Sequence, residues 1–258
     1  MRARKAYFSF SHLTDETKHH AYNSWHQLDH RPENLALDGV LYGERWVHTP
    51  RCAASRQAAD AVLAPVQYVT AYWFAEPSDV SISEWQDLAE ISFQWGRRPD
   101  RPWTLRPLQG FFSCVQTYVN PALPLSPEAL PYRPKRGVYV VATRVPVPHS
   151  DEAQSLFEWY DATAIPAHVA QQGVAGACTF SSDSTTMDEG WSERQGTTTF
   201  DVGTGERGQI RIYLYFLDGD PHSRDFAPPF PESEAEHALF AGPLETITPW
   251  QWDWFERT

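Results

Sequence analysis

The chain has 258 residues, of which 41% are hydrophobic, 21% charged and 14% aromatic, which is typical of a folded globular protein and excludes a disordered segment. Its 21 Lys and Arg against 33 Asp and Glu give a net charge of −12, which disfavours nucleic acid and anionic membrane surfaces as partners. No run approaches the roughly 18 apolar residues of a membrane span, and the first residues lack a signal-peptide core. We therefore expect no membrane association and a cytoplasmic protein.

The first half of the chain predicts the order strand, helix, strand, strand, helix, strand. Its opening segment is aromatic and alternating, as in a half-buried strand. The helical spacing that follows is interrupted at Pro32, and the turn residues Asp38 and Gly39 open the second strand. The predicted elements span residues 6–13, 15–37, 40–48, 66–75, 83–95 and 110–119.

The second half predicts the same order after a proline-rich connection. Residues 121–137 contain five prolines and predict an extended linker between a first domain, 1–120, and a second domain, 138–258. The polar stretch 181–208 exceeds an ordinary connection, so we expect it to be either disordered or a mobile flap. The predicted elements span residues 138–145, 151–171, 174–180, 209–217, 232–240 (a short helix) and 245–254.

An internal repeat underlies this parallel. Four residue pairs share one offset of 134 residues, and they are mostly Trp, Pro and Gly, which chance seldom places in a common register. We interpret the chain as two copies of one unit. The pairs are Trp25 and Trp159, Pro32 and Pro166, Gly39 and Gly173, and Val40 and Val174.

Two βαββαβ units predict an α+β fold. Each unit forms a four-stranded antiparallel sheet with both helices on one face, and the other face needs cover. If the two sheets meet edge to edge, one chain closes a barrel that a homodimer would otherwise build by symmetry. The terminal Trp250, Trp252 and Trp254 alternate, so we expect them on one face of the last strand.

The repeated segments resemble the dimeric α+β barrel superfamily, a group of ferredoxin-like folds, and in particular its EthD-like branch. There the first helix reads Trp-Tyr-Asp-x-x-His-x-Pro before Pro-Gly-Val. The resemblance implies a ligand pocket between sheet and helices, used for cofactor-free monooxygenation, polyketide cyclisation, isomerisation or dehydration, and in other branches for haem chemistry. The matching residues are Trp25, Asp29, His30, Pro32 and Gly39 in the first copy, and Trp159, Tyr160, Asp161, Pro166 and Gly173 in the second.

The resemblance places the family's helix histidine at His30, whereas the second copy has Ala164 there. We therefore expect one active site, in the first half, with the second half as scaffold. A neutral imidazole can remove a proton from a phenol, an enol or a carbon beside a carbonyl. The alternative is a helix-end histidine with a purely structural hydrogen bond. The expected catalytic residues are His30, His26 one helical turn before it, and Asp29, with Glu44 as another carboxylate that could set the tautomer of His30.

Aromatic and basic residues near this helix are candidates for substrate binding. Tyr22 and Trp25 share a helix face with His26, and Tyr72 lies on a predicted strand; their rings and hydroxyls suit an aromatic substrate. Arg45 could bind a carboxylate or an enolate, or else form an exposed ion pair.

Metal and cofactor sites have weak support. His26 and His30 have a spacing compatible with zinc, with a third ligand to come from His19, His48 or Asp29. Haem would need an axial ligand, and no attachment motif accompanies the candidates. The three cysteines form no C-x-x-C pair, so we expect small core residues, no metal and no cofactor. The haem candidates are His168, His222 and His237, and the cysteines are Cys52, Cys114 and Cys178.

These residues favour a cofactor-independent lyase, isomerase or cyclase that uses histidine acid/base chemistry on a small aromatic or polyketide-like substrate. One alternative is a cofactor-free monooxygenase of a hydroxylated aromatic. Another is a non-catalytic protein that binds a small molecule. Chains of this kind can also pair into homodimers through edge strands.

Overall fold

The computed structural model describes residues 3–98, 101–182, 208–229 and 233–255 of the chain. The first half forms its predicted elements, with an additional short helix and strand after the second strand. Most of the predicted flap, 181–208, lies outside the described residues. The elements of the first half are β1 (Lys5–Leu13), α1 (His19–Trp25), a π-helical turn (His26–His30), α2 (Arg31–Leu35), β2 (Val40–Val47), α3 (Pro50–Ser55), β3 (Ala58–Ala59), β4 (Tyr68–Phe74), α4 (Ser78–Gln94) and β5 (Thr104–Val119).

The second half begins at β6 and follows the prediction as far as its third strand. Ser150 caps α5 by accepting a hydrogen bond from the Ala153 amide, as the sequence-predicted helix start requires. The elements of the second half are β6 (Gly137–Val145), α5 (Asp151–Trp159), a π-helical turn (Tyr160–Ala164), α6 (Ile165–Val169), β7 (Val174–Ser182), β8 (Gln209–Leu217), a 3₁₀ turn (Arg224–Phe226) and β9 (His237–Thr246).

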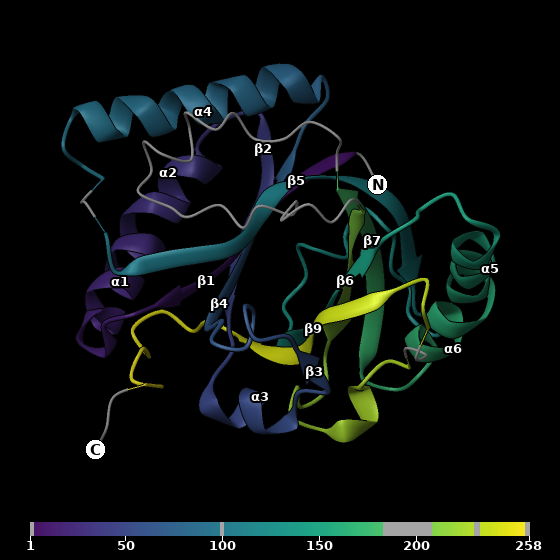
Figure 1. The fold of residues 1–258 in the computed structure, drawn as a ribbon. Helices are drawn as coiled ribbons and strands as arrows, with labels where there is room; N and C mark the ends of the chain where they lie inside the picture. The colour runs from purple at the N-terminus through teal and green to yellow at the C-terminus, as the bar shows by residue number, and fades with distance from the viewer. Residues whose placement is uncertain (1–2, 99–100, 183–207, 230–232, 256–258) are drawn as a thin grey trace.

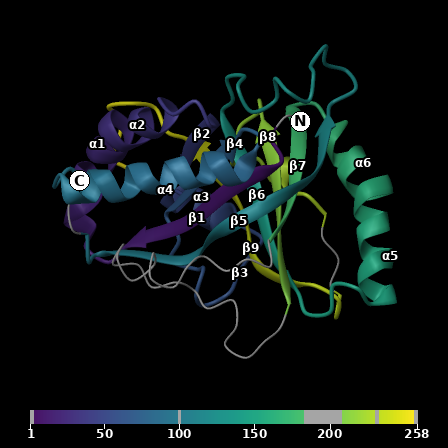
Figure 2. The same cartoon turned by 90° about the horizontal axis from the view of Figure 1, so that it is seen from above.

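The strands form one antiparallel sheet that closes on itself. Among the described residues the strand order is β2-β4-β1-β5-β7-β8-β6-β9-β3, and β9 also pairs with β2. Helices α1, α2 and α4 cover the outer face of the first-half strands, and α5 and α6 cover that of the second half (Figures 1 and 2). The result is a mixed α+β barrel with helices outside, as the sequence predicts.

The two halves of the sheet use their strands in the same way. The order β2-β4-β1-β5 in the first half corresponds to β7-β8-β6-β9 in the second. The π-helical turns also correspond, because Tyr160–Ala164 lies 134 residues after His26–His30, the offset seen in the sequence. Among the described strands, the two halves join where β5 pairs with β7 and where one edge of β9 pairs with β2 and with β3.

The barrel interior is the main hydrophobic core. Alternate side chains of each strand point inward, so Phe8 and Phe10 from β1 meet Trp73 from β4 and Phe180 from β7 in a ring-rich cluster. Phe8 contacts the Phe180 ring at a centroid distance of 4.9 Å in an edge-to-face arrangement. The inner faces of both half-sheets are therefore covered by each other.

The connection 121–137 packs against the barrel and is not a free spacer. Leu130 is fully buried in the barrel core. The Tyr132 hydroxyl donates a hydrogen bond of 2.8 Å to the Leu41 carbonyl of β2. The prolines prevent regular pairing here, but the segment adds apolar cover to the barrel.

The prediction for the last elements is wrong. The described part of 232–240 contains no helix, and the final strand is β9, about eight residues earlier than the predicted 245–254. The alternating tryptophans follow β9 and are not a strand: Trp252 is buried, whereas Trp250 is 73% exposed and has a φ of 70°. This C-terminal segment crosses to the first half, where Ile247 and Trp252 pack with Tyr22 and Tyr68 (Figure 1).

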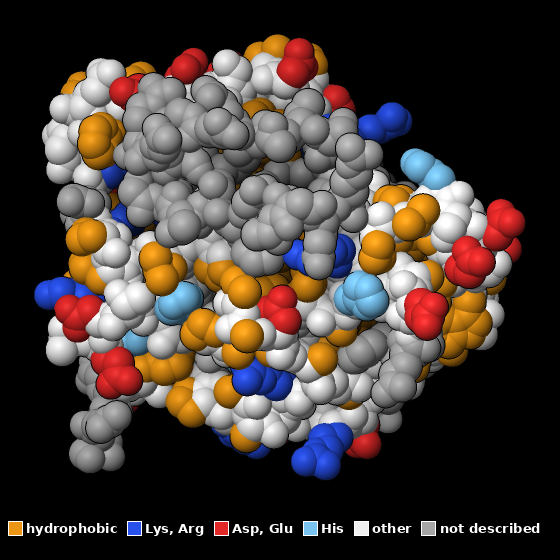
Figure 3. All heavy atoms as spheres, viewed as in Figure 1, with side chains coloured by type: hydrophobic (Ala, Val, Ile, Leu, Met, Phe, Trp, Pro, Cys, Tyr) orange, Lys and Arg blue, Asp and Glu red, His pale blue; other side chains and the backbone are white. Residues whose placement is uncertain are grey.

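The surface carries scattered charge. On the face in Figure 3, Lys and Arg side chains are dispersed among acidic and hydrophobic ones and form no broad basic patch. None of the described helices has both the length and the apolar character needed to cross a bilayer. Arginines are concentrated inside the first half, between its strands and helices.

Candidate functional site

A polar cavity lies between the first half-sheet and its helices. Its volume is about 30 Å³, room for about one water molecule. It lies on the sheet face opposite the barrel core, which is where the resemblance implies a ligand pocket. The lining residues are Tyr7, Ser9, Tyr22, His26, His30, Thr70, Tyr72, Trp85, Arg98 and Arg106.

Strand alternation supplies the floor of the cavity. Tyr7 pairs with Tyr72, and Ser9 pairs with Thr70, across the antiparallel β1–β4 ladder. Side chains two residues apart on a strand share a face, so these four residues point toward the helices while Phe8 points into the barrel. The Tyr7 hydroxyl donates a hydrogen bond of 2.8 Å to the Gln109 side-chain carbonyl of β5.

The π-helical turn supplies the two histidines. A π turn inside an α-helix shifts the direction of the side chains that follow, and such turns are frequent at functional sites. The His26 and His30 rings lie 5.2 Å apart, both are buried, and Trp25 stacks on His30 at 4.4 Å. The Asn34 side-chain nitrogen lies 3.3 Å from both the Tyr72 hydroxyl and the His30 ring. This places His30 firmly against the cavity wall.

Arginines make this region strongly cationic. Arg98 is buried and Arg106 half-buried, and both line the cavity. Arg45 on β2 is fully buried, with its guanidinium carbon 4.9 Å from the Tyr22 ring centroid. It donates a hydrogen bond to the Asn23 side-chain oxygen, but no carboxylate pairs with it within the described chain, and its Nε and Nη1 have no partner there. Among the residues that the structure describes, none that lines the cavity is a carboxylate.

Burial and this positive field set the ionisation of the site. Burial, followed by Arg98 and Arg101, holds the pKa of His30 well below its ordinary 6.5. Burial, Arg45 and His30 do the same for the pKa of His26. For Tyr22 burial raises the pKa, but Arg45, Arg106 and Arg101 outweigh burial and leave it below 10.0. The histidines are thus neutral at pH 7, and Tyr22 is a stronger acid than an ordinary tyrosine.

The structure brings together four of the seven residues expected from sequence. His26, His30, Tyr22 and Tyr72 line the cavity. Trp25 and Arg45 stand behind the lining, in contact with His30 and with Tyr22 respectively.

Asp29 does not lie where a catalytic partner of His30 was expected. It is exposed, and no contact joins it to His30 in the described structure, because adjacent residues on a helix point in different directions. Glu44 does not reach His30 either: it accepts a hydrogen bond from the Tyr42 hydroxyl and lies 3.7 Å from Arg31. Neither of the two carboxylates expected from sequence therefore sets the tautomer of His30.

Six lining residues were not expected as site residues: Tyr7, Ser9, Thr70, Trp85, Arg98 and Arg106. A signal for the arginines exists, since residues 97–106 contain four arginines in a chain of net charge −12. The direction in which a loop arginine points is not encoded by any periodicity. Tyr7 was one of an adjacent aromatic pair of which only one could face the site.

The zinc alternative at the histidine pair has no support in the described residues, where no third ligand joins His26 and His30. His19 instead lies with its Nδ1 2.7 Å from the Tyr68 hydroxyl. Three other side chains, Cys52, His222 and Glu245, lie close enough to one another to bind one metal ion.

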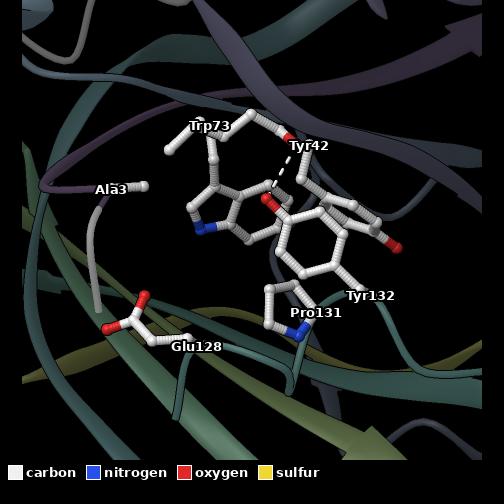
Figure 4. Close-up of a pocket in the computed structure, with 7 residues that line it drawn as sticks. Ala3, Tyr42, Trp73, Glu128, Pro131 and Tyr132 are labelled. Atoms are coloured by element: carbon white, nitrogen blue, oxygen red, sulfur yellow. Dashed lines mark hydrogen bonds between the residues drawn. The ribbon is translucent and has the colours of Figure 1, made fainter.

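A second, larger cavity lies at the mouth of the barrel beside residues 121–137. Its volume is about 210 Å³, and Figure 4 shows the rings of Trp73, Tyr132 and Pro131 around the hollow. Its walls are mostly apolar, with Glu128 as the one acid among them, and they contain no histidine. The acid/base groups are therefore concentrated in the smaller, arginine-lined cavity.

No protein-family model and no curated protein matches this chain. Among solved structures, a chlorite dismutase-like protein aligns with 99% of this chain and 98% of its own, at a TM-score of 0.50 and 10% identity. A monooxygenase-like protein from Fusobacterium nucleatum covers 95% of this chain and 96% of its own, with a TM-score of 0.43 and 10% identity. Another from Lactobacillus acidophilus covers 94% and 96%, with a TM-score of 0.40 and 12% identity. The first of these structures supports the fold alone: the chain shares its mixed α+β architecture over nearly the full length of both chains.

Proposed function

We propose that this protein is a cofactor-independent enzyme that removes a proton from a small hydroxylated aromatic or polyketide-like substrate and so catalyses a lyase, isomerase or cyclase step. One observation carries the proposal: in an acidic chain, the described residues that line one cavity include two histidines, three tyrosines and two arginines, and none of them is a carboxylate. Such a lining favours a ligand that is, or becomes, an anion.

His30 is the proposed base. A neutral imidazole can accept a proton, but burial and, after it, the field of the arginines oppose the positive charge that results, which is why the pKa of His30 is low in the free protein. A substrate that loses the proton becomes negative and cancels part of that field. Proton transfer to His30 and formation of the substrate anion therefore favour each other electrostatically.

Tyr22 is the proposed hydrogen-bond donor to the substrate oxygen. Its lowered pKa brings the acidity of the phenol closer to that of an enol or phenol substrate, which strengthens such a hydrogen bond. Arg98 and Arg106 would then stabilise the negative charge that the substrate acquires. The ring of Trp85 offers an apolar wall for an aromatic substrate.

A substrate can enter this cavity only if the helical elements that line it move apart. The free cavity holds only about one water molecule, much less than an aromatic ring needs. Trp85 belongs to α4 and Arg98 follows its end, whereas the histidines belong to the π-helical turn, so the lining comes from two separate elements. A small separation of these two elements would enlarge the site without disturbing the sheet.

The second candidate reaction is cofactor-free monooxygenation. It begins with the same ionisation, after which the substrate anion reduces O₂. The small volume of the cavity favours it, because a site with little room for water protects a reactive anion from reprotonation.

We further propose that the halves are a tandem duplication. The shared strand order and the 134-residue offset of the π-helical turns support this, in addition to the repeated Trp, Pro and Gly. Ala164 at the position of His30 leaves the second copy without a base, so it serves as scaffold.

The proposal is tested first by binding. A nitrophenol reports its own ionisation by colour, and in this cavity its pKa should fall because the arginines stabilise the phenolate. Replacing Arg98 with Met should abolish most of that shift. Binding of the neutral and ionised forms with equal affinity would contradict an anion-selective cavity.

Turnover of a panel of hydroxylated aromatics and β-polyketides, with oxygen uptake recorded, separates the candidate reactions. His30→Gln should lower kcat by about 10²–10⁴-fold, the usual contribution of a general base, while Glu236→Gln in the second half serves as the matched control. Oxygen consumed in step with product identifies the monooxygenase. Tight binding with no product from any compound would identify a carrier protein instead.

A further inference from the structure

Three potential metal ligands from both halves of the chain meet at the barrel seam between β2 and β9. Cys52 lies on α3 of the first half, His222 follows β8, and Glu245 lies on β9. One ligand atom from each lies within 4.8 Å of the others. The Cys52 sulfur is 3.9 Å from His222 Nδ1 and 3.8 Å from Glu245 Oε1, and His222 Nε2 is 3.1 Å from the same oxygen.

These distances are close to those of a zinc site. With Zn–S of about 2.3 Å and Zn–N or Zn–O of about 2.0 Å, tetrahedral geometry separates the ligands by about 3.3–3.5 Å. A histidine binds one metal ion through one ring nitrogen, and with one nitrogen of His222 the three ligand atoms lie within 4.8 Å of one another, so the cluster must contract toward these values when it binds the ion. The Glu245 side chain is 32% exposed and can rotate, whereas Cys52 is fully buried and fixed.

The surroundings support the ligands. The Thr49 hydroxyl donates a hydrogen bond of 2.8 Å to Glu245 Oε1, and the same hydroxyl lies 3.3 Å from the Cys52 sulfur. Outer hydrogen bonds of this kind orient metal ligands. A mixed thiolate, imidazole and carboxylate set selects a borderline metal such as Zn²⁺ over Mg²⁺ or Ca²⁺, which prefer oxygen alone.

The cluster lies beside the short pairing of β2 with β9. The β5–β7 seam extends over seven register pairs, whereas β2 and β9 share only two, Trp46 with Thr246 and Val47 with Glu245. Glu245 is thus both a ligand and a member of the weaker seam. A metal bound here would join β9 to the start of α3, two residues beyond the end of β2.

We propose that Cys52, His222 and Glu245 bind one zinc ion, with water as fourth ligand, and that this ion fastens the weak β2–β9 seam that closes the barrel. Because zinc is bound by a thiolate and not by a thiol, metal binding near neutral pH should release a proton from Cys52. This inference is independent of the proposed function, because the cluster and the arginine-lined cavity share no residue.

Cobalt(II) is the probe, added to the full-length protein after treatment with a chelator. We expect one ion per chain, a thiolate-to-cobalt charge-transfer band in the near ultraviolet, and displacement of cobalt by zinc. Cys52→Ser should lose that band, while Cys114→Ser, which removes a thiol elsewhere, should keep it. Absence of stoichiometric binding, or an unchanged band in Cys52→Ser, would overturn the site.

A second variant and a second measurement cover the case in which Cys52→Ser fails to fold. Glu245→Gln keeps the thiol and should weaken zinc binding by at least about tenfold. Zinc at 100 times its Kd should raise the Tm of the unmodified protein by about 5–10 °C. It should also slow amide hydrogen exchange at residues 46–47 and 245–246. Binding that leaves exchange at these residues unchanged would overturn the seam-fastening role.

Discussion

The two halves of this barrel share a strand order and a helix register, yet the space between sheet and helices is used in opposite ways. In the first half that space holds the arginine-lined cavity, with His26 and His30 on the π-helical turn. In the second half the corresponding turn carries Tyr160 and Ala164, which pack into an apolar cluster. The backbone of each half therefore leaves a space between sheet and helices, and the side chains that enter this space determine whether it forms a polar cavity or an apolar core.

The second half keeps a buried carboxylate in this layer. Glu236 is buried and accepts hydrogen bonds from the Tyr160 hydroxyl at 2.9 Å and the Tyr213 hydroxyl at 3.3 Å. Burial raises the pKa of this carboxyl, and the hydrogen bonds from its partners only partly offset that. Its hydrogen bonds are therefore satisfied within the protein, which suits a structural role.

We expect the largest effect on stability from the C-terminal segment that follows β9 and packs against the first half. Trp252→Ala should lower the free energy of unfolding by about 3–5 kcal/mol, because it empties a buried contact with the first-half cluster around Tyr22. Urea unfolding followed by circular dichroism measures this. Trp250→Ala, at the exposed neighbour, is the control and should change little; equal losses in the two variants would refute the assigned packing.

A gain of histidine in the second half should be harmful. Ala164→His places a large polar ring in a packed apolar cluster, so we expect a loss of about 1–3 kcal/mol in the free energy of unfolding and no new activity. Ala162→His, on the exposed side of the same turn, should be nearly neutral. If Ala164→His were as stable as the parent, the second half would have a cavity that the described residues do not show.

Buried neutral histidines are common to both halves and make the protein sensitive to acid. Burial lowers the pKa of His19 in the first half and of His168 in the second from 6.5 to about 4. Between these values the unfolded chain binds protons that the folded chain does not, so stability falls as pH falls from 6.5 toward 4.

Each such histidine contributes up to about 1.4 kcal/mol per pH unit to that slope. His19→Gln and His168→Gln should therefore each flatten it by a similar amount, measured by urea unfolding at several pH values. An unchanged slope in either variant would show that its histidine is protonated in the folded state.

The smallest expected effect concerns the pKa of Tyr22 in the first half. Arg45→Met removes the nearest positive charge, so the pKa of Tyr22 should rise. Difference absorbance of the phenolate, with Tyr22→Phe to identify its contribution, reports the change. A titration identical to that of the parent protein would mean that Arg45 does not set the ionisation of Tyr22.

Most of the architecture could be predicted from sequence because alternation and helical spacing are strong in the first half. The last strand was misplaced because β9 contains Gly242 and Pro243, which are unfavourable in strands. The structure accommodates Pro243 because β9 pairs on one side with β3 at residues 240–241 and with β2 at 245–246. The proline lies in the gap between these partners, where no amide hydrogen is needed.

The site could be predicted only in part. The histidines and Tyr22 share one helix, so spacing and resemblance find them together. Arg98 and Arg106 reach the cavity from a loop and the following strand, and the possible ligands Cys52 and Glu245 are 193 residues apart. Contacts of that kind arise from barrel closure, which no local pattern reports.

The C-terminal segment has a consequence for the order in which the protein folds. Residues 247–255 follow the last strand of the second half but complete the apolar cluster around Tyr22 and Tyr68 in the first, where Phe255 stacks on His19 at 4.3 Å. These residues are synthesised after the strands of both halves. The half that is synthesised first therefore acquires its finished wall only after the strands of the second half have been made, and the cluster around Tyr22 stays incomplete until then.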